Sequence, residues 1–125
     1  MTLAAAPTSF FLGTTDGDRS KAFYTEVLGL ACTDDSPFAV VFALANGELR
    51  VSKVQVLTPQ PWTVLDFQVS DLDSTMATLK GHGVAFLRYD GMDQDDAGVW
   101  TVPGAGVRIA WFKDPDDNVL SVSQR

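Results

Sequence analysis

The segment that decides the fold reads Lys21-Ala22-Phe23-Tyr24-Thr25-Glu26-Val27-Leu28-Gly29-Leu30. A helix is predicted from Arg19 to Leu28, because Asp16-Gly17-Asp18 is a natural helix-start signal and Gly29 stands where a left-handed C-terminal cap is expected. A short apolar strand is predicted before it, at Phe10-Phe11-Leu12. Helical spacing places four apolar residues on one face, which we expect to pack inward: Ala22, Phe23, Val27 and Leu28.

Turn residues separate three strand candidates that follow this helix. The strands are predicted at Leu30–Thr33, Phe38–Leu44 and Leu49–Val56. Asn46-Gly47 between two apolar runs is a strong hairpin signal, so the last two strands are expected to pair. The first half of the chain therefore has the order strand, helix and three strands.

The second half repeats this order after a period of about 55 residues. An alternating strand at Trp62–Val69 precedes a helix that Asp71 caps and that runs to Lys80. The apolar stripe of this helix is predicted at Leu72, Met76 and Leu79. The strands predicted after it are Ala85–Tyr89, Gly98–Val102, Val107–Phe112 and Val119–Ser123.

The duplication predicts an α+β fold of two tandem βαβββ modules that form a curved mixed sheet with a concave cleft. We expect a single domain over residues 1–125, with module one at about 8–56, a proline-containing linker at 57–61 and module two at about 62–124. Strand alternation then separates the residues that pack on the helices from those that face the cleft. The helix side is predicted to hold Phe10, Leu12, Leu65, Phe67 and Val69, and the cleft side Ser9, Phe11, Val64, Asp66 and Gln68.

Composition narrows the function classes. The 125 residues include 16 acidic and 9 basic side chains, a formal net charge of −7, with one Cys and one His. An acidic surface repels phosphate backbones, so no nucleic-acid partner is expected. A lone Cys forms no internal disulfide, and no run is long and apolar enough to cross a membrane, which favours a cytoplasmic protein without a membrane partner. One His and one Cys are few for a transition-metal site.

Two acidic segments have competing interpretations. The segment Asp114–Asn118 is either a calcium loop or a tight turn, and the tight turn is favoured because the EF-hand glycine and glutamate are missing. The segment Asp90–Gly98 is either a solvated loop or a functional loop that recognises a cationic ligand or closes over the cleft as a lid. The solvated loop is favoured because charged loops are usually exposed. Three residues that border this loop are candidates for a pocket: Tyr89, Met92 and Trp100.

Polar and aromatic residues within the strands are further candidates. Arg50 near Asp66 either holds a carboxylate or carbonyl substrate, with Asp66 as a general base, or forms an ion pair that only sets the strand register. Trp62, Trp100 and Trp111 either line a binding cleft or belong to the core or a dimer interface.

Two motifs give the chain a recognisable resemblance. The segment Lys21–Leu30 resembles the first-helix signature of the vicinal oxygen chelate superfamily, which includes glyoxalase I, bleomycin resistance proteins and extradiol dioxygenases. The segment Phe112–Leu120 resembles the closing motif of that superfamily, an aromatic-x-Asp-Pro-Asp-Gly-Asn turn. The resemblance covers about Thr8 to Gln124. It implies the duplicated fold and, for a short member, a homodimer.

The resemblance also locates where the metalloenzyme members bind a divalent ion. Those positions carry His, Glu or Gln in metal-binding members. Serine hydroxyls are poor ligands for such ions and valine is none, so we expect no metal and no cofactor. In this chain the positions fall at Ser9, Arg50 or Ser52, Val64 and Ser121.

Three functions remain open. The first is a metal-independent small-molecule-binding protein that resembles the bleomycin resistance group. The alternatives are a glyoxalase- or dioxygenase-like enzyme with a lost or relocated metal site, in which Asp66 is the catalytic candidate, and a non-catalytic scaffold or regulatory subunit. The predicted ligand-binding residues are Ser9, Phe11, Arg50, Ser52, Val64, Asp66, Gln68, Tyr89, Met92, Trp100 and Ser121.

Overall fold

The computed structural model describes residues 2–125 and divides the chain into two compact units that meet between Thr58 and Pro59. Each unit is described by itself, and the single-domain assignment stays a prediction. The first unit contains a short 3-10 turn η1 (Leu3–Ala5), β1 (Thr8–Thr14), α1 (Gly17–Ala22), a π-helical turn η2 (Phe23–Val27), β2 (Cys32–Asp35), β3 (Ala39–Leu44) and β4 (Gly47–Lys53). The second contains β5 (Thr63–Gln68), α2 (Leu72–Gly81), β6 (Trp100–Thr101), β7 (Arg108–Lys113) and β8 (Val119–Gln124).

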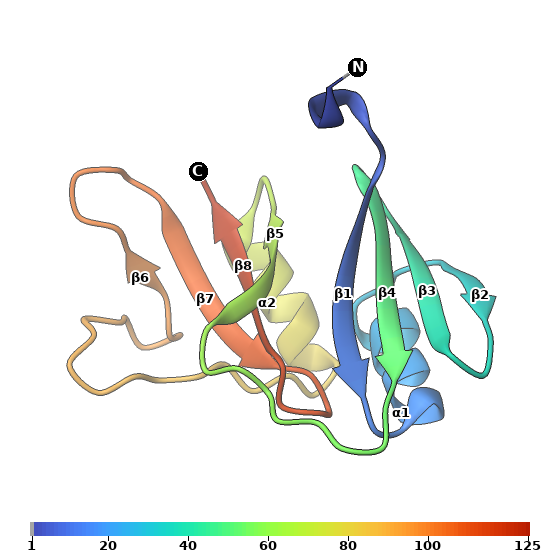
Figure 1. Cartoon of the computed structure of the whole chain (residues 1–125). Helices are drawn as coiled ribbons and strands as arrows, with labels where there is room; N and C mark the ends of the chain where they lie inside the picture. The colour runs from blue at the N-terminus through green and yellow to red at the C-terminus, as the bar shows by residue number, and fades with distance from the viewer. Residues whose placement is uncertain (1) are drawn as a thin grey trace. The chain divides into compact units, whose positions relative to one another are not determined.

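The two units have the same strand topology. The first sheet has the order β1-β4-β3-β2 and the second the order β5-β8-β7-β6. In both, the first and last strands of the unit pair in parallel while the other neighbours are antiparallel. Each helix lies against one face of its own sheet (Figure 1). The predicted α+β fold of two βαβββ modules is therefore confirmed, and the concave cleft stays a prediction.

The helix of module one differs from its prediction in which face is buried. Tyr24 is fully buried, where its ring packs 5.4 Å from that of Phe42 on β3, whereas Ala22 is exposed. The helix changes to a π turn at Phe23, and the Leu28 amide donates to the Phe23 carbonyl over five residues. A π turn inserts one extra residue and shifts the helical phase, so the regular spacing that selected Phe23 and Val27 no longer holds.

The predicted hairpin of module one is confirmed. Residues 45 and 46 form a two-residue loop, since Leu44 pairs with Gly47 across β3 and β4. Gly47 is required here because a Cβ at this position would collide with the backbone carbonyl of Thr8 on β1. The strand predicted at Leu30–Thr33 lies two residues later, as β2.

Module two matches its prediction in the helix but not in the first strand after it. The Asp71 side chain accepts a 3.0 Å hydrogen bond from the Ser74 amide at the start of α2, and the predicted stripe Leu72, Met76 and Leu79 is buried. The strand predicted at Ala85–Tyr89 is wrong. The Leu87 amide donates to the Trp111 carbonyl on β7 at 2.8 Å, but no strand ladder forms, because the Gln94 side chain donates to the Leu87 carbonyl and accepts from the Tyr89 amide.

Among residues 2–125, neither helix has the length and apolar character that a membrane span requires.

Candidate functional site

A hydrogen-bonded carboxylate lies on one face of the second sheet. Asp66 on β5 is opposite Ser121 on β8, and Gln68 is opposite Ser123. The Ser121 hydroxyl donates to Asp66 Oδ1 and the Ser123 hydroxyl donates to Oδ2, both at 2.7 Å. The two serines are buried while Asp66 is exposed. The serines thus fix the orientation of a carboxylate that keeps open acceptor positions toward solvent.

The indole of Trp111 crosses the same face. Trp111 on β7 is opposite Ser121 on β8. The Nε1–H group of Trp111 donates a hydrogen bond of 2.9 Å to the Thr63 hydroxyl on β5. Because β8 lies between β7 and β5, the indole must extend across β8 to make this bond. We call this surface the Asp66 face, defined by Thr63, Asp66, Trp111, Ser121 and Ser123.

Two further aromatic rings contact Trp111. The Tyr89 ring meets it edge-on, with centroids 5.6 Å apart and planes at 88°, and the Trp100 ring lies 6.3 Å away at 35°. Such aromatic pairs restrict one another and present a large apolar surface with few rotatable bonds. Two of the predicted ligand-binding residues, Tyr89 and Trp100, therefore join the Asp66 face through Trp111.

The structure modifies the predicted strand facing at Val64. The register between β5 and β8 shifts between Thr63 and Leu65, so Thr63 is paired with Val119 and Val64 falls within the irregularity. Strict alternation does not hold across such a bulge. The neighbouring residue Thr63 accepts the hydrogen bond from the Trp111 indole.

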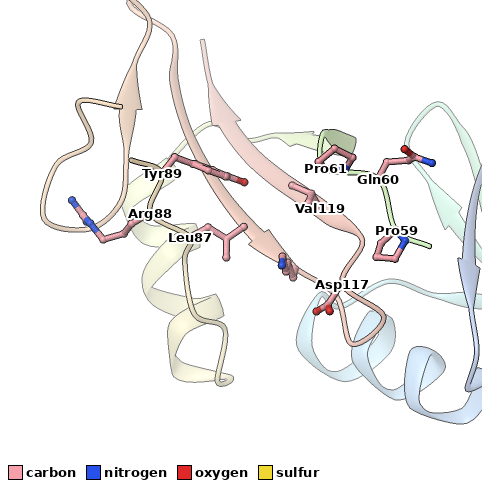
Figure 2. A pocket seen from close by; sticks show the side chains of 9 residues that line it. Pro59, Gln60, Pro61, Leu87, Arg88, Tyr89, Asp117 and Val119 are labelled. Atoms are coloured by element: carbon pink, nitrogen blue, oxygen red, sulfur yellow. The ribbon is translucent and has the colours of Figure 1, made fainter. Parts of the chain in front are cut away.

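A pocket of about 480 Å³ adjoins the Asp66 face within the second unit. Its lining includes Lys113 and Val119, which pair across β7 and β8. Figure 2 shows the Tyr89 ring over these strands, with its hydroxyl directed toward Val119 and Pro61. The lining residues are Pro59, Gln60, Pro61, Leu87, Arg88, Tyr89, Lys113, Asp117 and Val119.

Burial raises the pKa of the Tyr89 hydroxyl above its usual value near 10. Because the raised pKa lies far above neutral pH, the hydroxyl is a neutral hydrogen-bond donor under ordinary conditions. Tyr89 therefore supplies the pocket with both an apolar ring and a polar group.

The acidic loop at Asp90–Gly98 is ordered by its own contacts. Arg88 donates from Nη1 to the Asp95 carbonyl at 2.8 Å and from Nη2 to the Gln94 carbonyl at 3.3 Å. The Asp95 carboxylate accepts the backbone amides of Ala97 and Val99, each at 2.9 Å. The predicted pocket residue Met92 is half-buried in this loop, where its amide donates to the Tyr89 carbonyl.

The predicted site residues of module one lie on the corresponding strands β1 and β4. Phe11 is 65% exposed and pairs with Arg50 across the two strands. The Arg50 guanidinium lies 3.1 Å from the Glu48 carboxylate, an ion pair within module one. Ser9 is opposite Glu48, and Ser52 is opposite Gly13. A joint role for Arg50 and Asp66 stays a prediction.

The residues at the metal positions of the superfamily do not fit a divalent ion. Arg50 presents a cation that is paired with Glu48, and the Ser121 hydroxyl is committed to Asp66. Ser9 offers a hydroxyl and Val64 no donor atom. Within either module, over residues 2–125, no three His, Cys, Asp or Glu side chains form a metal-binding group.

The segment Asp114–Asn118 is a tight turn, as the sequence favoured. Asp114 Oδ1 accepts the amides of Asp116 and Asn118 at 2.9 Å, and Oδ2 accepts the Asn118 side-chain amide at 2.8 Å. Asp117, at the position of the superfamily glycine, has a positive φ of 66°. Asp adopts this left-handed backbone more readily than most residues.

Sequence reasoning missed Thr63, Lys113 and Ser123, and it left Trp111 open between a cleft, the core and a dimer interface. The alternation Ser121-x-Ser123 in the last strand was the available signal, because both hydroxyls lie on one strand face. Their pairing with Asp66 depends on the parallel register of β5 and β8, which no local pattern specifies.

Comparisons with known proteins agree with this architecture. Residues 7–122 match the model of the Glyoxalase/Bleomycin resistance protein/Dioxygenase superfamily. A search of curated proteins gave no match.

Solved structures of the same fold come from several sources. TnmS3, an antibiotic binding protein from Streptomyces sp. CB03234, is 23% identical with a TM-score of 0.73, over 99% of this chain and 98% of that one. Lactoylglutathione lyase from Agrobacterium tumefaciens is 18% identical with a TM-score of 0.73, over 96% and 93%. An integron cassette protein from the mobile metagenome of a Halifax Harbour sewage outfall is 16% identical with a TM-score of 0.76, over 97% and 99%. The chain belongs to the glyoxalase/bleomycin resistance protein/dioxygenase superfamily, within the vicinal oxygen chelate fold.

Proposed function

We propose that the protein binds a planar small molecule on the Asp66 face without a metal ion, in the manner of the bleomycin resistance group. The observation that carries this proposal is the indole of Trp111, which extends across β8 and is fixed by its bond to Thr63. A ring that is already held in place loses little conformational freedom when a ligand stacks on it. Such a surface favours stacking of a flat aromatic molecule.

Asp66 supplies the polar part of this binding surface. Each of its oxygens accepts one serine hydroxyl, and a carboxylate has about four acceptor positions, so a ligand N–H or O–H has places to bind. This arrangement supports a ligand-binding role for Asp66, with catalysis by Asp66 as the alternative. The antibiotic binding protein TnmS3 is a precedent for a binding role on this fold.

Metal independence, the absence of a cofactor, a cytoplasmic location and a homodimer belong to the same proposal. The side chains of Ser9, Arg50, Val64 and Ser121 support the first two, because none is a good ligand for a divalent ion. The net charge of −7 supports a small-molecule partner over nucleic acid.

The test is a calorimetric titration with planar aromatic probes, such as 2-naphthoate and 2-naphthamide, on the parent and on Trp111→Ala. We expect binding to the parent to weaken about tenfold or more in Trp111→Ala, since a stacked aromatic contributes on the order of 1–3 kcal/mol. Trp62→Ala is the matched control, because Trp62 is 62% exposed and has no aromatic partner among residues 2–125.

Two results would contradict the proposal. No binding of any planar probe at millimolar concentration would remove the binding role. Stoichiometric Zn, Ni, Mn or Fe in protein purified without a chelator would favour the enzyme alternative with a relocated metal site.

A further inference from the structure

Two hydrogen-bond donors that face the pocket have no protein partner. Among residues 2–125, the Lys113 ammonium has neither a hydrogen bond nor a carboxylate within ion-pair distance, and the Tyr89 hydroxyl has no acceptor. Lys113 is two residues from Trp111 on β7 and opposite Val119, so its side chain leaves the sheet on the Asp66 side. An ammonium and a hydroxyl together form a donor pair that suits an anion.

The other charged residues of the pocket do not compete with Lys113. The Arg88 guanidinium is bound to the carbonyls of the acidic loop, and Figure 2 shows it directed away from the gap between Tyr89 and Val119. In the same view the Asp117 carboxylate extends from the turn, away from the Tyr89 hydroxyl. Lys113 therefore supplies the cation that is open to a bound molecule in this pocket.

The remaining walls are mostly apolar. Leu87, Val119, Pro59 and Pro61 contribute apolar side chains to the lining. Adjacent Cα positions of one strand face are about 7 Å apart, so the Lys113 side chain starts roughly one fused-ring length from the Trp111 backbone. A flat ring on Trp111 thus places a substituent at the pocket.

From this arrangement we infer that the ligand is an aromatic acid: a planar ring system stacks on Trp111 and its anionic group is bound by Lys113 and Tyr89. The inference rests on the proposed function and specifies its ligand class. It runs against the overall charge of the protein, since a net charge of −7 favours cations at long range. A preference for anions would therefore have to come from local contacts in this pocket.

Three naphthalene probes of similar size distinguish the effect of the substituent's charge from the effect of ring stacking: 2-naphthoate, 2-naphthamide and 2-naphthylmethylammonium. Calorimetric titration of the parent is expected to give a dissociation constant about tenfold lower for 2-naphthoate than for 2-naphthamide, as one charge-assisted hydrogen bond supplies. The ammonium probe is expected to bind no better than the amide. Lys113→Met is expected to remove the preference for naphthoate and leave the affinity for naphthamide within about twofold.

Lys80→Met is the matched control, because it removes the same charge from an exposed residue of α2 that lies outside this pocket. Lys80→Met is expected to keep the preference for 2-naphthoate over 2-naphthamide. Tyr89→Phe is expected to reduce this preference by about threefold. Equal binding of all three probes, or an equal effect of Lys113→Met and Lys80→Met, overturns the inference and leaves the proposed function in place. Failure of every probe to bind the parent overturns the proposed function and the inference with it.

Discussion

The two modules share one topology, but the same sheet face carries different chemistry in each. In module one this face presents the exposed ring of Phe11 beside an Arg50–Glu48 ion pair. In module two it presents Asp66 bonded to two buried serines and an indole that crosses a strand. The duplicated core preserves the fold while the outer residues of the strands diverge, so a functional site on this fold has to be read from its own residues.

The helices show a second difference between the modules. Module one buries Tyr24 from a helix with a π turn, whereas module two buries three aliphatic residues from a regular helix. We expect Tyr24→Ala to lower the free energy of unfolding by about 3–5 kcal/mol, because it removes a fully buried ring that packs on Phe42. Urea unfolding followed by circular dichroism measures this. A loss below about 1 kcal/mol would contradict the role of the buried Tyr24 ring in holding the helix on the sheet.

The connection between the last two strands differs as well. In module two the strands are joined by a turn in which the Asp114 carboxylate accepts hydrogen bonds from Asp116 and Asn118. In module one they are joined by the two-residue loop that includes Asn46. Asp114→Ala is expected to cost about 2–3 kcal/mol, since it leaves buried donors without an acceptor. Asn46→Ala at an exposed loop is expected to cost less than about 0.5 kcal/mol. Equal losses of unfolding free energy in Asp114→Ala and Asn46→Ala, measured by urea unfolding, would contradict the assigned role of Asp114.

The polar groups on the two sheet faces should also differ in how much they contribute to the free energy of unfolding. Asp66→Ala is expected to destabilise the protein by about 2 kcal/mol, because the hydroxyls of Ser121 and Ser123 lose their acceptor in a buried position. Glu48→Ala breaks a half-exposed ion pair and is expected to cost less than about 0.5 kcal/mol. Thermal unfolding of both variants measures the two losses of stability. A larger loss of stability in Glu48→Ala than in Asp66→Ala would contradict this expectation.

The smallest expected effect is on acid stability. The hydrogen bond from Lys53 lowers the pKa of Asp35 below its usual value of 3.8, with Lys21 adding to this. A depressed folded-state pKa stabilises the protein above the unfolded-state pKa, and this contribution is lost as pH falls through the lower folded value. Arg108 lowers the pKa of Asp73 in module two in the same way.

Lys53→Met should therefore weaken the fall in melting temperature below about pH 4, and Lys80→Met should not. The comparison is made at low salt, where exposed ion pairs are least screened. Identical pH profiles for Lys53→Met and the parent would show that the Asp35 ion pairs contribute nothing to stability.

Local sequence signals predicted the parts of the structure that local interactions determine. The cap at Asp71, the hairpin near Gly47 and the Asp114 turn depend on residues a few positions apart, and each was recognisable. The duplication followed from repeating these signals in order. The fold was therefore largely predictable from the sequence.

The features that the sequence did not predict depend on contacts between residues that are distant in the chain. The Gln94 side chain binds the Leu87 carbonyl and the Tyr89 amide, and the Trp111 indole bonds to Thr63 across β8. The pairing of Asp66 with Ser121 joins residues 55 positions apart. Neither strand register nor a side chain that bonds to the backbone in the manner of a strand leaves a periodic signal in the sequence. The candidate site was therefore predicted only in part.

The most direct test of the central claim is a titration of 15N-labelled protein with 2-naphthoate, followed through backbone and indole N–H signals. The claim is that a planar ligand binds on the Asp66 face of module two. It predicts that the largest shifts occur at the Trp111 indole and at the backbone amides of Asp66 and Lys113. Shifts confined to β1 and β4 of module one, or no shifts at saturating probe, would contradict it.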